Sequence, residues 1–98
     1  MALLCGIDVG TTHVKVGFFD DRGGCAASVR RPTPRTLPAL VAAVLEALEE
    51  CAARAGRAPE AIGIAGMAET GVPLDASGHP LTPLLWWNDR RGTREAAA

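Results

Sequence analysis

The sequence has no tyrosine, only four aromatic residues, a single lysine and no CxxC pair. Its three cysteines, Cys5, Cys25 and Cys51, are far apart and have no histidine at a metal-ligand spacing, which argues against a zinc site. No apolar run approaches the roughly 18 residues of a membrane span, and no signal peptide opens the chain. A formal net charge of −1 provides no basic footprint for nucleic acid or an anionic membrane. We therefore expect a cytoplasmic protein with reduced core cysteines and with neither nucleic acid nor membrane as a partner.

The length of 98 residues allows at most one small domain, or a piece of a larger one. A hydrophobic share of 48% with 21% charged residues is typical of a folded globular chain. A chain of this size buries about 60–70% of its unfolded surface, so a core is possible but thin.

The most informative segment spans residues 5–20 and reads CGIDVGTTHVKVGFFD. It predicts an apolar strand that ends in Asp8, a tight turn through Gly10, Thr11 and Thr12, and a second apolar strand. A lone carboxylate followed by turn amides and hydroxyls suits a magnesium-bound polyphosphate. The carboxylate is a hard oxygen ligand, and N–H groups donate to phosphate oxygens. The alternative is that Asp8 merely caps the turn.

The first third of the sequence predicts an antiparallel three-stranded meander. Residues 3–8 are predicted to form a strand buried on both faces. From His13 the pattern alternates, which indicates a second strand with one apolar face formed by Val14, Val16 and Phe18. Turn residues 20–24 then lead to a third strand over 25–31, which ends at Pro32 and is therefore expected near an edge.

A helical period follows. The stripe of an amphipathic helix is formed by Leu37, Leu40, Val41, Val44, Leu45, Leu48, Cys51 and Ala55. Thr36 is predicted as its N-cap, Pro38 is tolerated in the first turn, and Gly56 suits the C-terminal stop. Glu50 and Arg54, on the polar side, are spaced for an ion pair.

The last third predicts a strand, a hairpin and the start of a helix. Residues 61–66 are predicted as another buried strand, whose small side chains permit close approach of a neighbour. Residues 72–75 and 81–87 flank a loop with Gly and Pro, which predicts a second hairpin. Residues 93–98 look like the first turns of a helix, with Thr93 as a possible cap. A helix that stops before it has a face to bury indicates a fragment.

A meander opened by Asp-x-Gly-Thr-Thr resembles the ribonuclease H-like half-domain of sugar kinases, actin and DnaK-type chaperones. Two further segments, IAGMAETGVPLD at 64–75 and PLLWWNDRR at 83–91, look like the N-terminal domain of the FGGY carbohydrate kinases. That family includes glycerol kinase, xylulokinase and gluconokinase. The resemblance covers nearly the whole chain. It implies an α/β, actin-like ATPase half-domain, incomplete over residues 1–98, from a kinase that transfers the γ-phosphoryl of ATP to a hydroxyl of a sugar, sugar acid or polyol.

The resemblance also implies roles for the residues of the first motif. Asp8 would be a catalytic and metal-binding residue beside Mg²⁺ and the transferred phosphate. Gly10, Thr11 and Thr12 would form a phosphate loop, and Lys15 would reach the phosphates of ATP as a point charge. The alternative for Lys15 is an exposed strand lysine.

The implied substrate-binding residues are Met67, Ala68, Glu69, Trp87, Asp89 and Arg90. Glu69 matches an acid that binds substrate hydroxyls in glycerol kinase, where xylulokinase has a histidine. Ala68 replaces the arginine of glycerol kinase, which argues against glycerol, whereas Glu69 argues against plain xylulose. Trp87 would form a wall of the sugar pocket, and Trp86 is expected in the core. The alternatives are a core or interface role for Trp87 and a surface ion pair within residues 89–91.

The resemblance implies ATP and Mg²⁺ as cofactors, and a sugar or polyol and the missing C-terminal part of the kinase as partners. The catalytic base of the family lies downstream, so the chain alone is expected to be inactive. No role is assigned to His13 or His79. Two alternatives remain open, namely a piece of an actin-like or chaperone-like ATPase and a truncated structural fragment that binds nothing.

Overall fold

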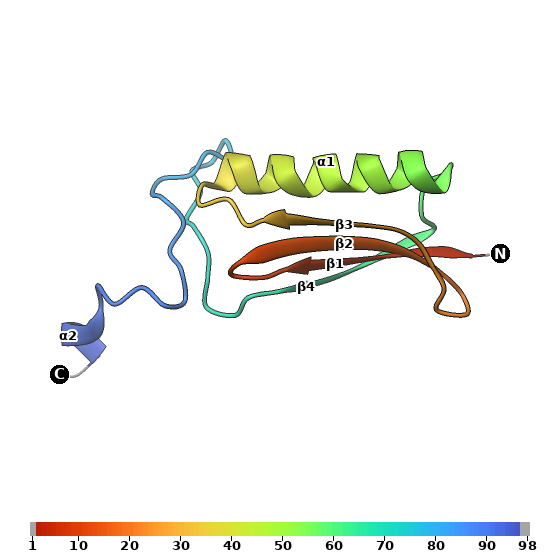
Figure 1. Ribbon diagram of the computed structural model, residues 1–98. Coiled ribbons are helices and arrows are strands. Elements are labelled where there is room, and N and C mark those ends of the chain that lie inside the picture. The colour runs from red at the N-terminus through yellow and green to blue at the C-terminus, as the bar shows by residue number, and fades with distance from the viewer. Residues whose placement is uncertain (1, 97–98) are drawn as a thin grey trace. The chain divides into compact units, whose positions relative to one another are not determined.

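The computed structural model describes residues 2–96, which divide into two compact units with the boundary between Met67 and Ala68. The first unit is a four-stranded sheet with one long helix (Figure 1). Its elements are β1 (Leu3–Val9), β2 (His13–Asp20), β3 (Cys25–Pro32), α1 (Leu37–Ala55) and β4 (Ala61–Gly66).

The strand order in the sheet is β3-β2-β1-β4. β2 runs antiparallel to both β1 and β3, which confirms the predicted meander, and β3 forms an edge, as expected from Pro32. β4 returns through α1 and pairs in parallel with β1. The sheet is therefore mixed, and the α/β fold class is confirmed.

The core lies between α1 and the sheet. Val14, Val16 and Phe18 of β2 are at most 1% exposed, as the alternation predicted. The helix contributes Ala43, Ala47 and Cys51 as its buried residues. Val41 and Leu45, which the predicted stripe included, are exposed. That part of the prediction is wrong, because the stripe that faces the sheet is centred on the small residues Ala43 and Ala47, with Leu40, Val44 and Leu48 packed beside them.

The predicted ends of α1 are confirmed. The hydroxyl of Thr36 accepts a hydrogen bond from the amide of Ala39 at 3.4 Å. Gly56 adopts a left-handed φ of 79°, and its amide donates to the carbonyl of Ala52 at 2.9 Å. Left-handed C-terminal residues are usually glycine, because a Cβ is disfavoured there. Glu50 and Arg54 form the expected ion pair, at 3.3 Å.

Two burial predictions are wrong, and both have the same cause. β1 is buried on one face only, and β4 is exposed at all six positions, with Ile62 50% and Ile64 72% exposed. A helix is about 10–12 Å wide, and neighbouring strands lie about 4.8 Å apart. α1 packs on β2 and β3, so it leaves β4 uncovered on one side, and the described residues of this unit leave the opposite face of the sheet open.

The cysteines divide in the same way. Cys5 and Cys51 are buried, as predicted, and burial raises the pKa of both thiols. Cys25, at the start of β3, is exposed, so the prediction of a core residue is wrong there. Within residues 2–96, no helix has the length and apolar character needed to span a membrane.

In the second unit, residues 68–96, the two segments of the predicted hairpin lie antiparallel around a tight turn, but they do not form regular strands. Two isolated antiparallel bridges join Gly71 to Leu85 and Leu74 to Pro80. Extended strand pairing is absent from the described part of this unit. The carboxylate of Asp75 accepts hydrogen bonds from the amides of residues 77 and 79, both at 2.9 Å. A local side-chain turn thus replaces regular strand pairing.

The unit ends in the short helix α2 (Thr93–Ala96). The hydroxyl of Thr93 donates to the carbonyl of Arg90 at 2.6 Å, so the expected N-cap role is wrong. Residues 97 and 98 of the predicted helix lie outside the described part of the chain.

Candidate functional site

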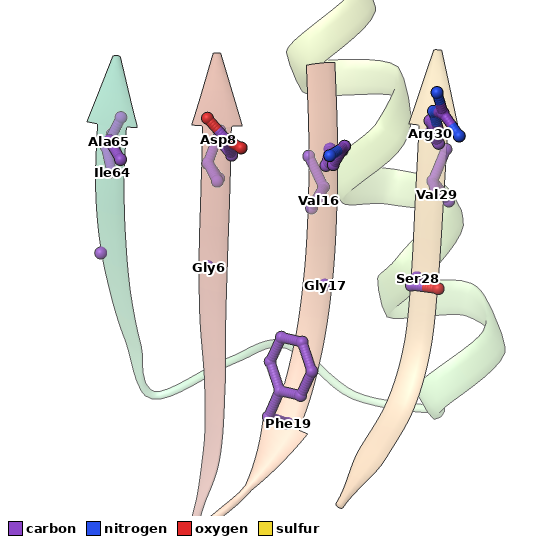
Figure 2. Close-up of a pocket in the computed structure, with 13 residues that line it drawn as sticks. Gly6, Asp8, Val16, Gly17, Phe19, Ser28, Val29, Arg30, Ile64 and Ala65 are labelled. Atoms are coloured by element: carbon purple, nitrogen blue, oxygen red, sulfur yellow. The ribbon is translucent and has the colours of Figure 1, made fainter. Parts of the chain in front are cut away.

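Asp8 and Lys15 lie on the open face of the sheet, opposite the face that α1 covers. They occupy directly opposed positions on β1 and β2, and both are exposed. Figure 2 shows Asp8 near the arrowhead of β1. Gly6 and Gly17, which have no side chains, lie farther from that arrowhead, on β1 and β2. The hollow over this face has a volume of about 820 Å³. The carboxylate of Asp8 is therefore accessible to a ligand bound in this hollow.

Asp8 forms no side-chain hydrogen bond or ion pair with any of residues 2–96. The alternative in which it caps the turn is therefore wrong. A carboxylate next to a turn but not used by it has its oxygens available for a cation or its water shell.

Gly10 is required by the geometry of the turn. Its amide donates to the carbonyl of His13 at 3.0 Å. A Cβ built on Gly10 would lie 2.9 Å from that same oxygen, closer than Cβ atoms approach in proteins. The Gly10 amide is thus engaged within the turn, and the absence of a Cβ lets the loop close tightly.

The two threonines of the loop have different surroundings. The Thr11 hydroxyl contacts the sulfur of Met67 at 3.1 Å, which brings this predicted substrate residue beside the loop. Thr12 is exposed, and its hydroxyl makes no hydrogen bond within residues 2–96. The Thr12 hydroxyl is therefore available to a ligand.

Lys15 also forms no ion pair with any described residue, although Asp8 is its cross-strand neighbour. An exposed ammonium group on the strand after the loop matches both interpretations of Lys15. Its position opposite Asp8 on the neighbouring strand places a positive charge beside the carboxylate. A metal-bound phosphate is stabilised by such a pair of charges.

Glu69, in the second unit, has a left-handed φ of 55°, the one non-glycine residue with positive φ in the described chain. Such a conformation costs about 1–3 kcal/mol for a residue with a Cβ and is concentrated at functional sites. The Glu69 side chain is exposed and has no partner among residues 2–96. Its carboxylate is therefore available to bind hydroxyl groups.

The two tryptophans differ in exposure. Trp87 is 54% exposed, which excludes the core alternative, and its amide donates to the hydroxyl of Thr70 at 2.9 Å. Trp86 is half-buried rather than in the core, because the predicted strand that would have turned it inward does not form.

Asp89 forms an ion pair with Arg91 at 2.7 Å, as the surface alternative predicted. Hydrogen bonds from the side chain and backbone of Arg91 lower the pKa of Asp89. Arg90 is exposed, and its backbone carbonyl accepts a hydrogen bond from the hydroxyl of Thr93. Asp89 is thus partly committed to a local turn.

A metal ion at this site would need ligands in addition to the side chains of residues 2–96. Residues 2–96 contain no group of three or more His, Cys, Asp or Glu side chains that could hold one. Mg²⁺ is commonly bound by one or two carboxylates together with substrate phosphates and water. The unpaired carboxylate of Asp8 fits that mode.

The first unit therefore brings together five predicted residues and Met67; the five are Asp8, Gly10, Thr11, Thr12 and Lys15. Ala68, Glu69, Trp87, Asp89 and Arg90 belong to the second unit, where Ala68 is exposed. Sequence reasoning missed Arg30, which faces the same hollow from β3. The alternation of β3, combined with the register of its hairpin with β2, is the signal that identifies it.

Comparison with known proteins matches this chain to carbohydrate kinases. The model of the N-terminal domain of the FGGY family of carbohydrate kinases matches residues 3–98. A xylulose kinase from an Arthrobacter species is 36% identical over 94 residues, which cover 93% of this chain and 98% of that sequence. A glycerol kinase from Methylorubrum extorquens is 35% identical over 106 residues, covering 94% of this chain and 21% of that protein.

Solved structures have the same fold. A xylulose kinase from Brucella ovis superposes with a TM-score of 0.83 at 30% identity, covering 97% of this chain and 23% of that one. The glycerol kinase of Plasmodium falciparum, solved with ADP, gives a TM-score of 0.82 at 19% identity, covering 99% and 22%. The chain thus spans about a fifth of the length of these full kinases. It belongs to the FGGY family of carbohydrate kinases, whose N-terminal domain it matches over residues 3–98.

Proposed function

We propose that this chain is the N-terminal, phosphate-holding portion of a kinase that transfers the γ-phosphoryl of ATP to a hydroxyl of a sugar, sugar acid or polyol. The observation that carries the proposal is the exposed, unpaired carboxylate of Asp8 beside the loop of residues 10–12 and opposite Lys15. Phosphoryl transfer depends mainly on positioning and on neutralising charge, and this arrangement supplies both.

Each candidate site residue of the first unit has a role in the proposal. Asp8 binds Mg²⁺ or its water shell, Thr12 donates its hydroxyl to a phosphate oxygen, and Lys15 neutralises phosphate charge. Gly10 keeps the turn tight, and Thr11 connects the loop to Met67. When bound, Mg²⁺ supplies further neutralisation of the phosphate charge.

The substrate portion of the proposal concerns the second unit. The strained backbone of Glu69 supports a role for its carboxylate in accepting hydrogen bonds from substrate hydroxyls. Exposed Trp87 offers an apolar surface to C–H groups of a sugar. Ala68, Asp89 and Arg90 are proposed to line the same substrate region. A kinase that consumes ATP is expected in the cytoplasm, and that is the location we propose.

The test compares the 98-residue chain with the same chain joined to whatever downstream sequence its gene encodes. ATP-dependent phosphorylation of a panel of sugars, sugar acids and polyols is measured for both. The shorter chain is expected to be inactive, because the catalytic base is proposed to lie downstream. In the longer protein, Asp8→Asn is expected to lower turnover about a hundredfold with little change in the KM for the sugar.

Asp21→Asn is the matched control, since Asp21 is an exposed carboxylate in the β2–β3 turn and lies outside the proposed site. Unchanged turnover in Asp8→Asn would remove Asp8 from the metal site. Sugar phosphorylation by the 98-residue chain alone would contradict the proposal that essential groups lie downstream.

A further inference from the structure

Arg30 lies on the open face in the same row as the two charged residues of the candidate site. β3 pairs with β2 so that Arg30 is opposite Lys15, and Lys15 is in turn opposite Asp8 on β1. Opposed side chains on one face of a sheet have Cβ atoms about 4.5–5.5 Å apart. Figure 2 shows Asp8 and Arg30 near the arrowheads of their strands. The row therefore places two cations beside one carboxylate at the end of β1 that leads into the loop.

Asp8 is the one acidic side chain among these three opposed residues, so the row carries one excess positive charge. Within residues 2–96, neither Lys15 nor Arg30 forms an ion pair. Like charges directly opposite each other destabilise a strand pair. A polyanion bound over the row would relieve this repulsion, so the row favours a ligand that carries several negative charges.

Arg30 instead contacts His13. Its Nη2 lies 3.2 Å from Nδ1 and 3.5 Å from Nε2 of the imidazole. A guanidinium can only donate, so the imidazole supplies the acceptor in this contact, and the tautomer decides which ring nitrogen that is. This contact uses one of five guanidinium donors. The other donors remain available for the bidentate binding that arginine offers to phosphate.

The end of β3 is also fixed to the loop. The amide of Thr33 donates to the carbonyl of Thr12 at 2.9 Å, and the Thr33 hydroxyl donates to the carbonyl of Gly10 at 2.7 Å. Thr33 follows Arg30 by three residues, and His13 directly follows Thr12. The loop, His13 and Arg30 are therefore held together by backbone contacts in addition to the side-chain contact.

We propose that Arg30 is a further polyphosphate-binding residue and that His13 positions its guanidinium beside the phosphate loop. The ligand class is the phosphate chain of a nucleoside triphosphate, recognised by charge and fork geometry and not through the base. This inference rests on the proposed function, because it adds a contact to the same phosphate site.

The test measures the affinity of the 98-residue chain for inorganic tripolyphosphate in the presence of Mg²⁺ by isothermal titration calorimetry. Arg30→Gln is expected to weaken binding roughly tenfold, the scale of one hydrogen bond to a charged group. Arg30→Lys should retain part of the affinity, because it keeps the charge and loses the fork. Arg22→Gln is the matched control, since it removes the same charge from the exposed β2–β3 turn.

His13→Ala tests positioning through a double-mutant cycle. It should weaken binding in the wild-type background and have no further effect in Arg30→Gln, an outcome that a merely structural role would not produce. Equal affinities of Arg30→Gln and Arg22→Gln, with Lys15→Gln still weakening binding, would overturn the role of Arg30 and leave the proposed function intact.

Absence of tripolyphosphate binding by the wild type, or indifference to Lys15→Gln, would contradict the phosphate site itself and the role of Arg30 with it. Thermal unfolding of each variant is recorded in parallel. Should Arg30→Gln be poorly folded, the comparison of Arg30→Lys with Arg22→Lys decides the matter. Equal affinity of those two variants would overturn the proposal.

Discussion

At the residue scale, Gly10 is the position at which the loop tolerates least change. Gly10→Ala would place a Cβ 2.9 Å from the carbonyl oxygen of His13, so the turn must shift. We expect a loss of about 1–3 kcal/mol in the free energy of unfolding, the usual cost of overpacking. Urea denaturation followed by tryptophan fluorescence or circular dichroism measures this loss.

Gly63→Ala is the matched control for that substitution. Gly63 lies in β4, and a Cβ built on it meets no atom within 4 Å. It should leave stability unchanged or slightly raised. A loss of equal size in both variants would show that the close approach at Gly10 is not the cause.

The buried thiols predict an alkaline decline in stability. Burial raises the pKa of Cys5 and Cys51, so the folded state favours the protonated thiols. Their contribution is complete below the pKa of an unfolded cysteine, about 8.5. It is lost as pH rises from there through the higher folded-state pKa. The sequence has no tyrosine, so no phenol titrates in this window.

Chemical denaturation between pH 7 and 10 checks this expectation. The free energy of unfolding of the wild type should fall with pH, and the slope should be smaller in Cys51→Ala. Cys25→Ala, which replaces the exposed cysteine, serves as the control and should keep the wild-type slope. A pH-independent stability in the wild type would contradict the burial of the thiols.

At the scale of elements, the ends of α1 are the features that local chemistry determines best. Gly56→Ala should cost about 1 kcal/mol, because alanine is disfavoured at a φ of 79°. Gly56→Asn should cost less, since asparagine tolerates the left-handed region. Thermal or urea unfolding of the two variants measures the difference, and equal losses would argue against backbone conformation as the cause.

The elements also show what the sequence could and could not predict. β2 and α1 were predicted from local signals, namely alternation about Val16 and caps at Thr36 and Gly56, and these signals do not depend on distant residues. The burial of β4 was mispredicted, because an apolar strand carries no information about whether a helix covers it. The hairpin around Asp75 was predicted with longer strands than it has, because the Asp75 side chain bonds the turn amides and competes with strand pairing.

The candidate site was likewise predictable only where its residues belong to one local motif. Asp8 and Lys15 were found because a contiguous motif contains both of them. Arg30 was missed because its place beside Lys15 depends on the register between β2 and β3. That pairing includes an irregularity at Phe18 and Phe19 of β2. Register is set by the whole hairpin, so no local motif contains this information.

At the scale of the whole molecule, each face of the sheet has apolar surface that the described residues of the first unit do not cover. Ile7 and Ile64 are neighbours in register on the helix side, yet Ile7 is 4% exposed and Ile64 is 72% exposed. Uncovered apolar surface promotes association. We expect the isolated chain to self-associate at high concentration and Ile64→Thr to raise its monomer fraction.

Analytical ultracentrifugation measures that change. Ile64→Thr should alter the free energy of unfolding by no more than about 0.5 kcal/mol, as is usual for surface positions. The matched variant Ile7→Thr should cost about 2 kcal/mol or more, because it removes buried apolar atoms and buries a hydroxyl. Similar costs at the two positions would contradict the finding that α1 leaves β4 uncovered.

The central claim is that Asp8 and the following turn hold a magnesium-bound polyphosphate. The most direct measurement is a ¹H–¹⁵N NMR titration of the 98-residue chain with Mg²⁺ and ATP. The account predicts shifts concentrated at the amides of residues 10–12 and at Lys15, and their loss in Asp8→Asn but not in Asp21→Asn. Shifts that are absent from this loop, or equally strong in Asp8→Asn, would contradict it.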